Sequence, residues 1–113
     1  MKRVTFYNKP WGQNPFKYRP LLSFLSKKSW EACAELAFHI TNAPEECLSP
    51  AQRRMARAIF KRNKYKGPSL SVGDVVRVTD CKTGETHFLR CDSYGWSFAT
   101  IDLDREHFIK EGV

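Results

Sequence analysis

The chain has 113 residues, of which 42% are hydrophobic and 13% aromatic, so one domain can fold on a core of its own and two ordinary domains cannot fit. The formal net charge of +7 is uneven: residues 1–66 hold 14 Lys and Arg against 4 Asp and Glu, and residues 67–113 hold 5 against 8. The first part is therefore a candidate surface for polyanions, and the second is not. We expect a single domain over 1–113, organised as 1–28, 29–66 and 67–113.

Neither a membrane-spanning segment nor a metal or cofactor site is expected. No apolar run approaches the length of a membrane span, so we expect a soluble, cytoplasmic protein with no membrane partner. The cysteines are separated by 14, 34 and 10 residues, unlike the short spacings of zinc ligands, so no metal and no cofactor is expected. We expect four buried free thiols: Cys33, Cys47, Cys81 and Cys91.

The N-terminal segment combines a strand with an irregular stretch. Alternation over residues 2–7 predicts a strand, and the prolines, glycine and asparagines of residues 8–20 predict a long loop or arm. Basic and aromatic side chains alternate in this arm: Lys9, Trp11, Phe16, Lys17, Tyr18 and Arg19. Cations neutralise phosphates and aromatic rings stack on bases, so the arm is a candidate nucleic-acid contact. The alternative is that the aromatic rings fold back and cap the core.

A first helix is predicted over residues 30–41, with Ser29 as its N-cap. Apolar residues recur at helical spacing, and this face should cover the sheet: Trp30, Cys33, Leu36, Ala37 and Ile40. His39 has no Cys or His three or four residues away, so we expect a solvated side chain rather than a ligand or base.

A second helix is predicted from residue 50 to about 62 or 63, because Ser49 and Gln52 fit a capping box and Pro50 suits the first turn. At about 100° per residue, cations share one arc: Arg53, Arg54, Arg57, Lys61 and Lys64. Apolar side chains share another arc: Ala51, Met55, Ala58 and Ile59. Phe60 is expected at the exposed edge of the basic arc, and Arg62 near the apolar side.

The basic arc is the sharpest functional feature of the sequence. Cations without intervening carboxylates gain no ion pairs and repel one another, which favours an anionic partner. The alternative is an ordinary solvated helix face. Acidic residues follow at 102–110, where we expect a turn and a short final helix, and they are a possible internal partner.

Residues 69–101 predict three antiparallel strands. Gly73 and Asp74 lead into a valine-rich strand, residues 82–85 close a hairpin, and Gly95 precedes a third run over 96–101. We predict an α+β fold: a small antiparallel sheet, made of the N-terminal strand and a C-terminal three-stranded meander, with two helices packed on one face. The alternative is a small SH3-like barrel with a helical insertion.

Residues 69–76 (SLSVGDVV), 91–96 (CDSYGW) and 37–42 (AFHITN) carry a resemblance over about residues 30–101. They are similar to a family of small proteins of phages, plasmids and conjugative elements, called YodL-like. The resemblance implies that the gene lies on a mobile element and that the protein shares the fold of this family. It supplies no catalytic residue.

Three hypotheses follow. No nucleophile, base and orienter are placed together, so we do not expect an enzyme. The leading hypothesis is an accessory protein of a phage or mobile element that binds nucleic acid through Arg53, Arg54, Arg57 and Lys61. The alternative is an inhibitor that binds a host enzyme or defence complex, with Trp11, Phe16 and Tyr18 as anchors. A homo-oligomeric module using an exposed edge strand is the third, and the sequence leaves the oligomeric state open.

Overall fold

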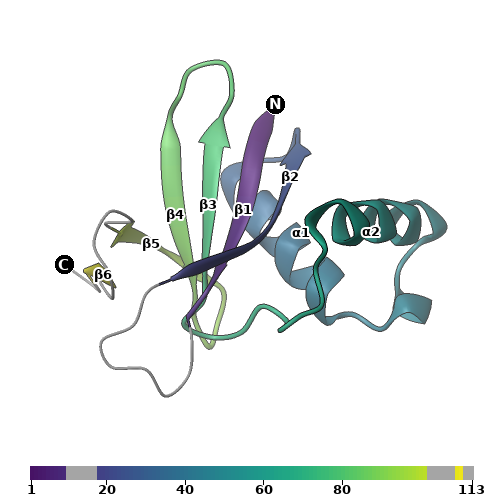
Figure 1. The fold of residues 1–113 in the computed structure, drawn as a ribbon. Coiled ribbons are helices and arrows are strands. Elements are labelled where there is room, and N and C mark those ends of the chain that lie inside the picture. The colour runs from purple at the N-terminus through teal and green to yellow at the C-terminus, as the bar shows by residue number, and fades with distance from the viewer. Residues whose placement is uncertain (10–17, 102–108, 111–113) are drawn as a thin grey trace.

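The computed structural model describes residues 1–9, 18–101 and 109–110, with side chains described up to residue 100. Its elements are β1 (Lys2–Asn8), β2 (Arg19–Ser26), α1 (Trp30–Asn42), η1 (Glu45–Cys47), α2 (Pro50–Asn63), β3 (Val75–Asp80), β4 (Thr86–Cys91), β5 (Trp96–Ile101) and β6 (Ile109–Lys110). The strands form one antiparallel sheet in the order β2-β1-β3-β4-β5-β6 (Figure 1). The predicted α+β fold, with its N-terminal strand and C-terminal meander, is confirmed.

Strand β2 was not predicted, and residues 19 and 20 were assigned to the loop. It pairs with β1 through Val4 opposite Phe24 and Phe6 opposite Leu22, and Leu22 and Phe24 are buried. Pro20 is tolerated because β2 lies at the edge of the sheet, where a missing N–H donor costs little. The identity of this segment is decided by its pairing with β1 rather than by its own composition.

One core cluster joins both helices to the sheet. Val4 and Phe6 of β1 and Val76 and Val78 of β3 are fully buried against the apolar face of α1. That face is the predicted one, with Trp30 at its margin. Helix α1 contacts β1, β3 and β4, whereas α2 contacts β2 (Figure 1).

The cap predictions are confirmed, but the apolar arc predicted for α2 is partly wrong. Ser29 accepts a hydrogen bond from the Ala32 N–H, and Ser49 and Gln52 form a reciprocal capping box. Ala56 and Ile59 are buried, whereas Ala51 and Ala58 are exposed. The reason is that α2 packs on the unpredicted strand β2, which rotates its buried face away from the predicted arc.

The end of α2 is held against β2 by a side-chain amide. Asn63 accepts a hydrogen bond from the Ser23 N–H at 3.0 Å and donates one to the Ser23 carbonyl at 3.0 Å. The amide thus pairs with the outer edge of β2 as a neighbouring strand would. This contact fixes which face of α2 points outward.

The expectations for the cysteines and for the C-terminal segment are only partly met. Cys33 and Cys91 are buried free thiols as predicted, but Cys47 and Cys81 are exposed, because Cys47 ends the short surface helix η1 and Cys81 lies in the turn between β3 and β4. Residues 109 and 110 form the short strand β6 where a final helix was expected, and residues 102–108 lie outside the described part of the chain. Within the described residues, no helix is long and apolar enough to cross a membrane.

Candidate nucleic-acid interface

The outward face of α2 is centred on Arg54 and Lys61. Both side chains are exposed, and neither makes an ion pair or hydrogen bond with any residue that the structure describes. Lys64, which is exposed and left-handed at φ 52°, closes the helix and adds a third such cation. Between residues 50 and 63 the helix carries five Lys and Arg and no Asp or Glu. The exposure of these three side chains agrees with their predicted place on the basic arc.

Arg57 lies on the same face but is not free. Its guanidinium donates a hydrogen bond to the Glu45 carboxylate of η1 and forms an ion pair with it. The Arg57 side chain remains 67% exposed, so the pair is a surface ion pair that contributes at most about 1 kcal/mol. The expectation of a face without carboxylates is therefore wrong at this position, because η1 folds back beside the helix.

Arg53 lies at the boundary between this face and the interior. It is half-buried, and its Nη2 group donates a hydrogen bond to the Leu48 carbonyl at 3.2 Å. Its Nε–H is buried and has no hydrogen-bond partner among the residues that the structure describes. The prediction that this side chain extends freely into solvent is therefore wrong.

A small cavity of about 230 Å³ lies beside Arg53, between α2, η1 and the end of α1. Its lining is mostly apolar and includes Ile40, Leu48, Ala56 and Phe60. Phe60, which was expected to be exposed, is half-buried and lies 4.9 Å from the Tyr65 ring, measured between centroids. No pattern in the sequence predicts this cavity, because it depends on how α1, η1 and α2 meet.

Arg62 is exposed at the other side of α2, and its Nη2 donates a hydrogen bond to the Ser23 carbonyl at 3.3 Å. It borders a groove of about 620 Å³ between α2 and β2, which also contains Arg3, Leu25 and Ala58. The sequence predicts that Arg62 points toward the apolar side of the helix, and in the structure this side faces the edge of β2.

The described ends of the N-terminal arm, residues 8–9 and 18–20, are not part of the α2 face. Lys9 follows the last residue of β1, and Arg19 is the first residue of β2. The end of β1 and the start of β2 lie away from α2 (Figure 1). The Lys9 N–H donates to Asp74, and Arg19 donates to Asn8. Tyr18 is buried and donates to the Gly73 carbonyl, so this aromatic caps the core instead of contacting a partner. Trp11, Phe16 and Lys17 lie outside the described residues.

Asp74 is the buried polar centre of the segment that leads into β3. Its carboxylate accepts hydrogen bonds from the Lys9 N–H at 2.8 Å, the Ser71 N–H at 2.9 Å and the Asn8 amide at 3.3 Å. Burial nevertheless raises the pKa of this carboxyl above its ordinary value, because the three donors offset only part of the desolvation. Asp74 thus ties β1 to the start of β3.

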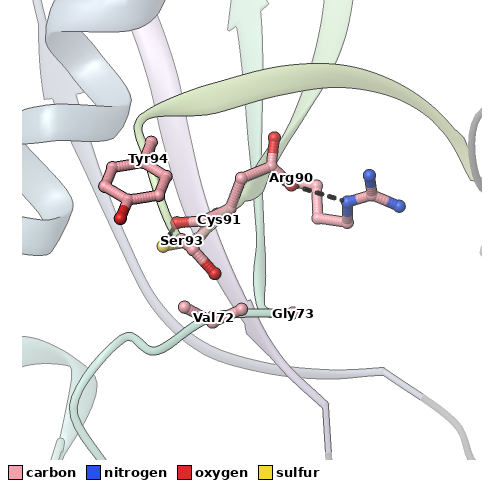
Figure 2. A pocket seen from close by; sticks show the side chains of 7 residues that line it. Val72, Gly73, Arg90, Cys91, Ser93 and Tyr94 are labelled. Atoms are coloured by element: carbon pink, nitrogen blue, oxygen red, sulfur yellow. Dashed lines mark hydrogen bonds and ion pairs between the residues drawn. The ribbon is translucent and has the colours of Figure 1, made fainter.

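A third depression, of about 500 Å³, lies beside the turn between β4 and β5. Figure 2 shows Tyr94 and Val72 on opposite sides of it. Arg90 pairs with Asp92 at 3.1 Å, and Tyr94 is 96% exposed. Burial, with a smaller effect of Asp74, raises the Cys91 pKa to about 11, so this thiol is protonated at neutral pH.

Comparison with known proteins adds no family to this description: no family model, curated protein or solved structure matches the chain. Among the described residues, no group of three or more His, Cys, Asp or Glu side chains could hold a metal ion.

Proposed function

We propose that this protein is a non-enzymatic accessory protein of a phage or other mobile element, and that it binds nucleic acid through the outward face of α2. The observation that carries the proposal is the pair Arg54 and Lys61, one above the other on a helix without acidic residues. Phosphates would neutralise their mutual repulsion. The mobile-element context rests on the resemblance of residues 30–101 alone.

The contact would be dominated by phosphates. Arg54, Lys61 and Lys64 supply three cations that have no ion-pair partner within the described part of the chain, and Arg57 becomes a fourth when a phosphate displaces Glu45. Short polar side chains that read base edges are sparse on this face, so discrimination between duplex sequences should be weak. The same positions would suit a sliding or scanning mode of binding.

Charge reversal at the centre of the face tests the proposal. The double variant Arg54→Glu/Lys61→Glu should lose at least about tenfold in affinity for a short duplex at low salt, measured by fluorescence anisotropy. The matched control is Lys27→Glu/Lys82→Glu, which makes the same change of net charge at two exposed positions outside α2. Equal loss in both double variants would show that net charge, not this face, governs binding.

Exposed aromatic side chains support a second candidate, an inhibitor that binds a host protein. Tyr94, Phe98 and Phe38 are 96%, 58% and 37% exposed, and aromatic residues are frequent anchors of protein interfaces. Tyr18 is buried, so its side chain cannot serve as an anchor for a partner protein. Pull-down from a nuclease-treated host lysate separates the candidates: one stoichiometric protein favours the inhibitor, and its absence with recovery of nucleic acid from untreated lysate favours the first proposal.

A further inference from the structure

We infer that the cavity beside Arg53 receives a single unstacked base, so that the preferred ligand of α2 is single-stranded rather than duplex nucleic acid. The inference rests on the proposed function, because it assumes that phosphates lie along Arg54, Arg57 and Lys61. It assigns a second contact to the same ligand.

The position of the cavity links it to the basic face. Arg53 and Arg57 line both the cavity and one border of that face. A strand whose phosphates follow α2 would therefore pass the mouth of the cavity. Its volume of about 230 Å³ suits one flat ring system and not a folded peptide.

The lining defines what can enter. Ile40, Leu48, Ala56 and Phe60 present apolar surface, and Glu45 lines the cavity beside Arg53 and Arg57, so a bare phosphate there would lose hydration and face a carboxylate. Arg53 and Arg57 also line the cavity with guanidinium groups, which are hydrogen-bond donors only, and among the described residues the buried Nε–H of Arg53 has no acceptor. An occupant should therefore combine apolar faces with at least one acceptor atom.

A nucleobase meets both conditions. Its two faces are apolar, and its ring nitrogens and carbonyl groups are acceptors. Phe60 offers an aromatic ring at the wall of the cavity, and stacking on such rings tolerates any base. A base inside a duplex cannot reach the cavity without leaving its stack, which is why the inference favours single strands.

Three probes test this inference on the full chain: a short oligothymidylate, an abasic strand of the same length and phosphate count, and a duplex. Affinities are measured at one low salt concentration. The oligothymidylate should bind between about fivefold and about a hundredfold more tightly than the abasic strand, which is the range expected for one stacked base. It should also bind more tightly than the duplex.

Two variants locate the base. Ala43→Leu narrows the cavity and should abolish the preference for oligothymidylate over the abasic strand, whereas Ala51→Leu, an exposed position on α2, should leave it unchanged. Arg53→Lys keeps the charge but removes the Nε–H donor. It should reduce the preference for oligothymidylate without lowering the affinity for the abasic strand. It provides an independent test if Ala43→Leu proves unstable.

The failures of the two proposals are distinguishable. Salt-dependent binding of equal strength to the oligothymidylate and abasic strands, or a preference that survives both Ala43→Leu and Arg53→Lys, would overturn the base site and leave phosphate binding by α2 intact. No binding of any probe at low salt would overturn the proposed function itself.

Discussion

Glu45 binds Arg57 across the boundary between η1 and α2, so a carboxylate from outside the helix reaches its basic face. Both side chains are more than half exposed. A ligand phosphate must compete with Glu45 for Arg57, and the cost of this competition is small, because exposed ion pairs contribute at most about 1 kcal/mol. Glu45 therefore tempers the affinity of the face without blocking it.

Removing this carboxylate should strengthen nucleic-acid binding. Glu45→Gln releases Arg57, so affinity at low salt should rise by roughly twofold to fivefold and the log-log salt slope should steepen by about 0.9, measured by anisotropy on a duplex. Glu46→Gln is the matched control, because Glu46 is its exposed neighbour in η1 and changes net charge equally. Equal gains in both variants would contradict a specific competition at Arg57.

Asn63 should contribute to stability through its pairing with Ser23. Asn63→Ala leaves the N–H of Ser23 without its partner at 3.0 Å, so we expect the free energy of unfolding to fall by about 1–3 kcal/mol in urea denaturation. Lys61→Ala, at an exposed position of the same helix, should change it by less than about 0.5 kcal/mol. A loss of similar size in both variants would mean that the amide pairing is not what holds α2 to β2.

Asp74 should make stability depend on pH. Its pKa in the folded state is raised by burial, so protonation favours folding. Its stabilising contribution is complete below the ordinary value of 3.8 and is lost as pH rises through the raised value. As pH falls from neutrality toward the ordinary pKa of 3.8, the wild-type protein should therefore gain stability relative to Asp74→Asn. Urea titrations at several pH values measure this difference. The opposite trend would show that the three hydrogen bonds outweigh burial.

The four thiols should divide into two reactive classes. Iodoacetamide at neutral pH should modify Cys47 and Cys81, which are exposed, before Cys33 and Cys91, which are buried. The raised Cys91 pKa of about 11 slows this residue further, because the thiolate is the nucleophile. Mass spectrometry should count two adducts on the native protein and four in urea. Modification of Cys91 as fast as Cys81 would contradict its burial.

Local signals in the sequence were sufficient for much of the fold. Ser29, Ser49 and Gln52 mark helix starts through hydrogen bonds that span three residues, and Gly84 lies in the predicted hairpin turn at φ 80°. Strand β2 could not be predicted in the same way. Its first residues, Arg19 and Pro20, favour irregular structure, and only pairing with β1 overrides that preference.

The candidate site shows the same division. Helical periodicity alone placed Arg54 and Lys61 together on the outside of α2. The half-burial of Arg53, the Glu45 contact of Arg57 and the cavity beside them depend on where η1 folds against α2. That placement is a tertiary property, and no spacing within the helix encodes it.

The salt dependence of wild-type binding to a short duplex is the most direct test of the proposed role of α2. Phosphate contacts by Arg54, Lys61 and Lys64 predict a log-log slope of about −3, steepening to about −4 when Arg57 joins them. A slope near zero, or an affinity that survives Arg54→Glu/Lys61→Glu unchanged, would contradict nucleic-acid binding through this helix.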